Sequence, residues 1–80
     1  MNISILAFGI ARDIVGASEF DFAVEESQTV GELKQELVRH YPDFAKLASF
    51  AIAVNGNYVS DEHPLQGDDE VVIIPPVSGG

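Results

Sequence analysis

Residues 29–41 read Thr-Val-Gly-Glu-Leu-Lys-Gln-Glu-Leu-Val-Arg-His-Tyr, and this stretch decides the fold. Thr29 and Glu32 are spaced as a capping box, in which each side chain bonds the backbone N–H of the other, so we predict a helix that begins here. Its apolar residues form a single stripe at helical spacing: Val30, Leu33, Leu37, Val38 and Tyr41. Pro42 ends the pattern because proline has no backbone N–H to donate. One such helix can cover one face of a small sheet.

Short strand patterns lie on both sides of this helix. Residues 2–8 and 19–24 alternate between apolar and polar residues, which predicts an antiparallel pair, and a helical turn over 10–15 separates them. After the helix, strands are predicted at 51–54, 58–59 and 70–74, with a hairpin turn at Asn55-Gly56 and a further turn at 64–67. The predicted fold class is therefore α+β, a roll in which a four- to five-stranded mixed sheet carries one main helix on one face.

The last strand pattern leads directly into Pro75-Pro76-Val77-Ser78-Gly79-Gly80. Two prolines end a strand and favour a stiff, extended backbone. Residues 75–80 can then span roughly 20 Å, at about 3.3 Å each. The final glycines have no side chain, so they can enter a slot that a Cβ atom would block. We predict a domain body over residues 1–74 and an extended tail over 75–80; the alternative is a frayed terminus.

The composition limits the chemistry that the side chains can perform. The chain has 80 residues, which is one domain, and no Cys, so it has no disulfide, no thiolate metal site and no thiol nucleophile. No signal peptide or membrane-spanning run is expected, and the cytoplasm is the predicted location. Asp61, Glu62 and His63 lack a second ligand cluster, so no metal site is predicted. The C-terminal carboxyl of Gly80 is the best candidate for a reactive group.

The formal net charge of −9 argues against nucleic acid and against an anionic membrane surface as partners. It suits a protein partner with a basic pocket, and attraction over distance would then weaken with salt. The alternative is that the charge serves solubility only.

The order of elements, the size and the Gly-Gly end resemble the ubiquitin-like β-grasp fold, and more specifically the small subunits of molybdopterin synthase, a family of ubiquitin-like sulfur carriers. The resemblance is carried by Phe8, Arg12, Val15-Gly16, Thr29-Val30, Leu33, Ala53-Val54-Asn55, His63-Pro64-Leu65, Gly67-Asp68-Asp69-Glu70-Val71 and the tail Pro75-Pro76-Val77-Ser78-Gly79-Gly80. The thiamin-pathway sulfur carriers share the fold and the diglycine, but they are usually shorter and lack this Pro-Pro-Val stalk.

The resemblance implies that the chain has little or no catalysis alone and binds no cofactor. An adenylating, ubiquitin-activating-like enzyme would use ATP to adenylate Gly80, and a sulfur donor protein would supply the sulfur of a thiocarboxylate. The tail would then enter the large subunit of molybdopterin synthase and donate sulfur to a pterin precursor during molybdenum cofactor biosynthesis, within a heterotetramer. The alternatives are a carrier for thiamin or tRNA thiolation, a ubiquitin-like protein modifier, and an interaction module with an inert tail.

Strand parity predicts an apolar patch on the sheet face that the helix does not cover. The first and last strands are parallel neighbours in a β-grasp sheet, so Phe8 and Ile74 should meet where the tail leaves, with Tyr58 nearby. The predicted partner-binding residues are Phe8, Arg12, Tyr58, Ile74, Pro75, Pro76, Val77, Ser78 and Gly79. Arg12 would pair either with a partner carboxylate or with an acid of its own chain. The alternative is that loops cover the patch or that it is ordinary surface.

Overall fold

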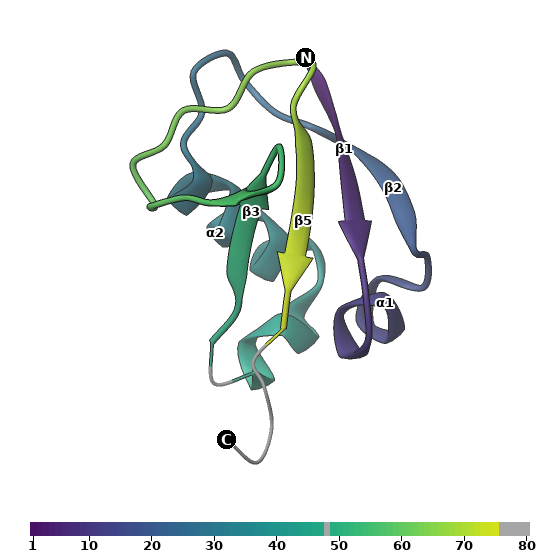
Figure 1. Cartoon of the computed structure of the whole chain (residues 1–80). Coiled ribbons are helices and arrows are strands. Elements are labelled where there is room, and N and C mark those ends of the chain that lie inside the picture. Colours follow the sequence, from purple (N-terminus) through teal and green to yellow (C-terminus); the bar gives the residue numbers. More distant parts are fainter. Residues whose placement is uncertain (48, 76–80) are drawn as a thin grey trace.

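Five strands form one mixed sheet in this computed structural model, which describes residues 1–47 and 49–75 (Figure 1). The strands are β1 (Asn2–Ala7), β2 (Glu19–Ala23), β3 (Ala51–Val54), β4 (Asn57–Tyr58) and β5 (Glu70–Ile74). Their order across the sheet is β2-β1-β5-β3-β4, with β1 and β5 parallel and the other neighbours antiparallel. The main helix α2 (Val30–His40) packs on one face. The predicted α+β roll is confirmed.

The start of α2 is fixed both by its own side chains and by a distant loop. The backbone N–H of Thr29 donates to Glu32 Oε1 at 2.9 Å, and the N–H of Glu32 donates to Thr29 Oγ1 at 3.3 Å, which confirms the capping box. The next two free N–H groups, of Val30 and Gly31, donate to the carbonyl oxygens of His63 and Asp61, each at 2.9 Å. The loop after β4 therefore satisfies the helix terminus that would otherwise lack partners.

The hydrophobic core lies between α2 and the inner face of the sheet. Val30, Leu33 and Leu37 of the helix are fully buried. The sheet contributes the inward side chains of its central strands: Ile3, Ile5, Ala7, Ile52, Val54, Val71 and Ile73. Burial of each large side chain contributes about 1.5–3 kcal/mol, so this layer supplies most of the favourable folding term.

Three smaller features complete the chain, and the sequence predicts the first and the last of them. The short helix α1 (Ile10–Val15) ends at Gly16, which takes the left-handed conformation with φ of 88°. A 3₁₀ helix, η1 (Pro42–Lys46), follows α2 and buries Phe44 against the core. Asn55 and Gly56 both have positive φ, 52° and 87°, as a type I′ hairpin turn between β3 and β4 requires.

The turn predicted at 64–67 is wrong in its position. Pro64 forms an isolated bridge with Thr29, and Leu65 is buried, so this part of the loop is extended. The turn closes later, where the N–H of Asp69 donates to the carbonyl of Gln66 at 3.1 Å. The Asp69 carboxylate in return accepts the N–H of Gln66 at 2.8 Å, which a Gly and Pro pattern does not reveal.

The bounds of three strands also differ from the prediction. β1 ends at Ala7, one residue before Phe8, and β2 ends at Ala23, one residue before Val24. β4 covers Asn57–Tyr58 with Val59 outside it. β5 ends at Ile74, where the predicted domain body ends. The division into a body and a tail stays a prediction, because residues 76–80 lie outside the part of the chain that the structure describes.

Candidate functional site

The carboxyl ends of β1 and β5 lie side by side at one end of the molecule (Figure 1). The parallel register pairs Leu6 with Val72 and Ala7 with Ile73. Pro75 lies over Gly9, where a Cβ atom added to the glycine would be 3.9 Å from Pro75 Cγ. The first residue of the predicted tail therefore starts beside the turn that follows β1.

An apolar surface covers the sheet face opposite α2, and we call it the outer-face patch. Its exposed or partly exposed members are Leu6, Phe8, Ala51, Tyr58, Val72 and Ile74, and the buried Ala53 lies in the same row of side chains. The register places Leu6, Val72, Ala53 and Tyr58 in one row across four strands. Phe8 and Tyr58 are 55% and 72% exposed, which is unusual for side chains of their size. Within the part of the chain that the structure describes, α2 lies on the other face, and an exposed apolar surface of this kind is typical of a protein interface.

Of the five predicted site residues that the structure describes, Phe8, Tyr58 and Ile74 belong to this surface. Phe8, Ile74 and Pro75 lie at the end where β5 finishes, and Tyr58 lies across the sheet on β4. Arg12 is exposed on α1, at the same end of the molecule. Residues 1–47 and 49–75 provide no carboxylate within ion-pair distance of its guanidinium, so the own-chain pairing is not observed there. The remaining predicted residues lie outside the described residues: Pro76, Val77, Ser78, Gly79 and Gly80.

The predicted site did not include every residue that this surface contains. Ala51 and Ala53 pair with Ile74 and Val72, so their small side chains continue the patch onto β3. Strand parity could have found them once β3 was placed next to β5. Ile10 is 49% exposed at the start of α1, and its short helix carries no pattern that would mark it as surface.

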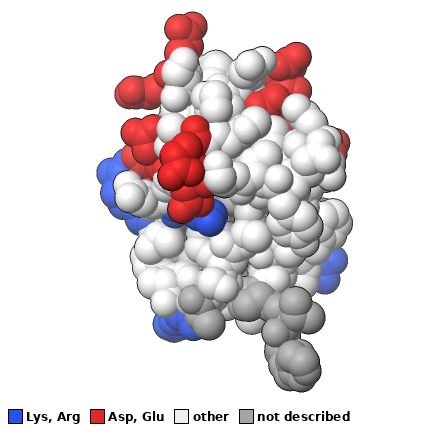
Figure 2. Space-filling view, turned by 60° about the vertical axis from the view of Figure 1, so that its left-hand side comes forward, with Lys and Arg blue, Asp and Glu red and all other residues white. Residues whose placement is uncertain are grey.

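Charge is distributed unevenly over the molecule. Figure 2 shows carboxylates over the upper part and the centre of one side, whereas its lower part is largely uncharged, with scattered Lys and Arg. The carboxyl ends of β1 and β5 point toward that lower part (Figure 1). On the face that Figure 2 shows, the carboxylates therefore lie mainly away from the end where β5 finishes.

Two other kinds of site, a metal centre and a membrane-spanning helix, have no counterpart among the described residues. Asp61 forms an ion pair with Lys34, at 2.9 Å between Nζ and Oδ1, and residues 1–47 and 49–75 contain no group of three or more His, Asp or Glu able to hold a metal ion. None of the helices described there is long and apolar enough to cross a membrane.

The sequence pattern of the ThiS family matches residues 5–80. The chain belongs to this family. It is 32% identical over 81 residues to a molybdopterin synthase sulfur carrier subunit of Arabidopsis thaliana, covering 100% of this chain and 84% of that one. It is 35% identical over 81 residues to the protein of the same name from Escherichia coli, covering 98% of this chain and 99% of that one. The predicted resemblance to sulfur carriers is confirmed.

Two solved structures share the fold of this chain. A Pyrococcus furiosus protein described as molybdopterin converting factor, subunit 1, has a TM-score of 0.87 at 28% identity, over 96% of this chain and 99% of that one. Subunit 1 in a Helicobacter pylori complex of subunits 1 and 2 of molybdopterin-converting factor has a TM-score of 0.67 at 25% identity, with full coverage of both chains. The β-grasp architecture of this family member is thus the one that the sequence predicts.

Proposed function

We propose that this chain is the sulfur-donating small subunit of molybdopterin synthase, and that it carries sulfur as a thiocarboxylate on Gly80. Membership of the ThiS family and the names of its relatives support this role. The observation that carries the proposal is the end of β5. This strand lies beside β1, and both strands contribute side chains to the outer-face patch. From Pro75, beside Gly9, the sequence continues to Gly79-Gly80. A partner that binds this face would receive the terminus at the same place.

The composition supports a main-chain carrier. The chain has no Cys, so no side chain can hold sulfur as a thiol or persulfide. A carboxylate is a poor electrophile, and it needs a better leaving group before sulfur can attack. Adenylation by a separate activating enzyme supplies AMP as that group and releases pyrophosphate. Sulfide delivered by a donor protein then attacks the acyl carbon, and AMP leaves with the C–O bond broken, which gives the thiocarboxylate. ATP is used by the activating enzyme, and no resident cofactor is proposed for this chain.

The proposed main partner is the large subunit of molybdopterin synthase, bound through the outer-face patch. The Helicobacter pylori complex joins subunit 1 of that organism to its subunit 2, which supports an assembly of the same kind here. Phe8 and Tyr58 are suitable anchors, because large exposed aromatic side chains dominate many interfaces. Arg12 is proposed to meet a carboxylate of the partner, and residues 75–79 are proposed to line the path to its active site. The proposed location is the cytoplasm.

Reconstituted synthesis tests this proposal. The chain, the large subunit, the activating enzyme, ATP and a sulfur donor are combined with the pterin precursor, and formation of the dithiolene product is measured. A variant that lacks Gly80 and one with an extra glycine after it should both lose the activity, because a shift of one residue, about 3.3 Å, removes the near-attack geometry. Both should bind the large subunit and unfold at the same urea concentration as the parent. Product formation at the parent rate by both variants would refute a role for Gly80.

A further inference from the structure

Strand β2 forms one edge of the sheet, and half of its backbone groups face away from β1. The N–H of Val24 donates to the carbonyl of Met1 at 2.8 Å, and the Met1 ammonium donates to the carbonyl of Val24 at 2.9 Å. At the other end, Ala7 N–H donates to the carbonyl of Ser18 at 2.9 Å. Bonded and non-bonded pairs alternate in an antiparallel ladder. The outward-facing N–H and C=O groups therefore belong to Glu19, Asp21 and Ala23.

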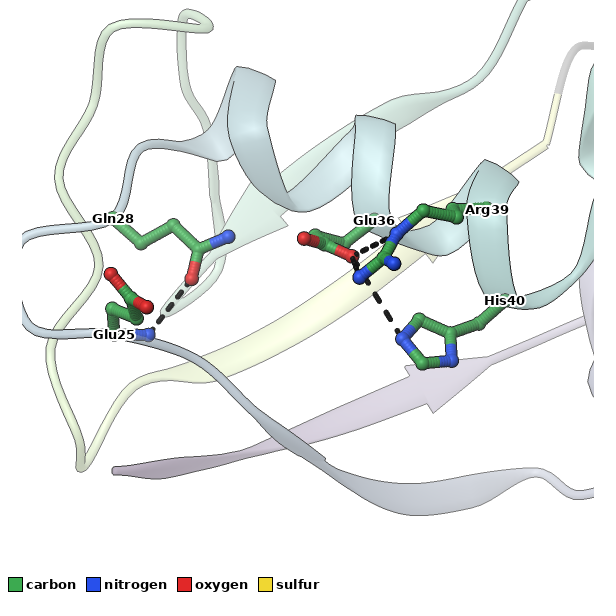
Figure 3. Close-up of polar contacts among 5 residues, drawn as sticks. All are labelled: Glu25, Gln28, Glu36, Arg39 and His40. Carbon is green, nitrogen blue, oxygen red and sulfur yellow. Dashed lines mark hydrogen bonds and ion pairs between the residues drawn. The ribbon is translucent and has the colours of Figure 1, made fainter.

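A groove of about 550 Å³ opens between this edge and α2. Residues 22–28 form one wall, and the outer side of α2 from Glu32 to His40 forms the other (Figure 3). Within the wall formed by residues 22–28, the N–H of Glu25 donates to Gln28 Oε1 at 2.8 Å. Within the wall formed by α2, Arg39 Nε donates to Glu36 Oε2 at 2.9 Å.

We infer that this edge and groove bind an extended, basic segment of a partner protein, which adds to β2 as a further strand. Exposed sheet edges offer a row of backbone partners to such a segment, and an adjoining groove accepts its side chains. The negative charge around this edge and groove favours Lys and Arg side chains in the bound segment. Glu19 and Asp21 extend from the strand itself, and the groove is lined by Glu25, Glu26 and Glu32. The one Arg in the groove is already paired with Glu36.

A second copy of this chain is a poor occupant for the same edge. Two antiparallel β2 strands would bring Glu19 and Asp21 of both copies together, and like charges facing each other across strands are destabilising. Each copy also has a formal net charge of −9. The acidic edge thus opposes self-association and favours a basic partner.

Binding at this edge would leave most of the outer-face patch open. Glu19 pairs with Leu6 of the patch, but its backbone groups face away from β1, and Ala23 pairs with Asn2 at the other end of that strand. At about 3.3 Å per residue, Asn2 and Phe8 are roughly 20 Å apart. One partner could hold the protein at the Ala23 end of β2 while another receives its terminus. This inference does not depend on the proposed sulfur chemistry.

Titration of the full-length, ¹⁵N-labelled chain with a synthetic peptide tests the inference by NMR. The probe is acetyl-Lys-Val-Lys-Val-Lys-Val-Lys-amide, and the control peptide has Glu in place of each Lys. We expect the basic peptide to shift the amide signals of Glu19, Asp21 and Ala23 and to slow their hydrogen exchange, and the acidic peptide to do neither. Absence of these changes at millimolar basic peptide, or changes confined to the outer-face patch, would overturn the inference.

Two sets of variants separate strand addition from general charge attraction. Ala23→Pro removes one outward N–H at a position where an edge strand tolerates proline, and it should weaken binding by about tenfold. The double variant Glu25→Gln with Glu26→Gln should also weaken it, whereas Glu62→Gln with Asp68→Asn, which changes the net charge equally, should not. Parent affinity in a folded Ala23→Pro variant, or equal losses in both double variants, would contradict binding at β2.

Discussion

At the scale of single residues, Asp69 shows how a buried carboxylate holds two loops together. It is only 8% exposed, and it accepts hydrogen bonds from Asn55 Nδ2 at 2.9 Å and from the N–H of Gln66 at 2.8 Å. Asn55 Oδ1 in turn accepts the N–H of Glu70 at 2.9 Å. These bonds join the β3–β4 turn to the start of β5, the strand that leads to the tail.

Asp69→Ala should therefore lower the free energy of unfolding by about 1–3 kcal/mol, because it removes a carboxylate that accepts two partly buried hydrogen bonds. Asp68→Ala is the matched control: its side chain is exposed and makes no hydrogen bond with another described residue, so its effect should stay within about 0.5 kcal/mol. Urea unfolding followed by circular dichroism measures both. Equal midpoints for the two variants would show that the Asp69 bonds contribute nothing.

At the scale of elements, the sequence predicts the helices and turns that neighbouring residues specify by themselves. The capping box at Thr29 and Glu32 placed the start of α2, and Asn55-Gly56 placed the hairpin. The turn predicted at 64–67 lies at Gln66–Asp69 instead, where the buried Asp69 carboxylate accepts the N–H of Gln66. The groove beside β2 was not predicted at all, since its two walls come from a strand and a helix that only the tertiary fold brings together.

The candidate site was predictable to a similar extent. Alternation along β1 and β5 indicated that Phe8 and Ile74 share one face, and the structure places both at one end of the sheet. Alternation could not add Ala51 and Ala53, because their place beside β5 depends on the register of β3. Nor could it decide the partner of Arg12, whose guanidinium lies on a short, exposed helix.

Phe8→Asp should weaken binding of the large subunit by about 2 kcal/mol, or roughly thirtyfold in Kd, because it places a charge within an apolar interface. The fold should persist, since Phe8 is 55% exposed and lies outside the core cluster. Gln35→Glu, on the exposed side of α2, adds the same charge and should leave the affinity unchanged. Isothermal titration calorimetry compares them, and parent affinity in folded Phe8→Asp would refute the outer-face patch as the docking surface.

At the scale of the whole molecule, a small body presents two separate surfaces. The outer-face patch crosses the sheet from Leu6 on β1 to Tyr58 on β4, whereas the outward backbone groups of β2 lie at the opposite edge from β4, with the groove on the α2 side. The net charge of −9 creates a field that acts beyond either surface. Long-range attraction and short-range packing can therefore be varied independently.

Association with a basic large subunit should slow as the salt concentration rises, while dissociation should change less, because screening acts on the encounter more than on the packed interface. Stopped-flow measurements at two ionic strengths give both rates. An association rate that does not change with salt would mean that the acidic excess has no part in this encounter.

The central claim is that Gly80 carries sulfur, and intact-protein mass spectrometry tests it most directly. The chain is incubated with the activating enzyme, ATP and a sulfur donor, and its mass is compared with that of a sample without ATP. The account predicts an ATP-dependent increase equal to replacement of one oxygen by sulfur, located at Gly80 by fragmentation and absent when Gly80 is deleted. An unchanged mass in the parent, or the same increase in the chain that lacks Gly80, would contradict the account.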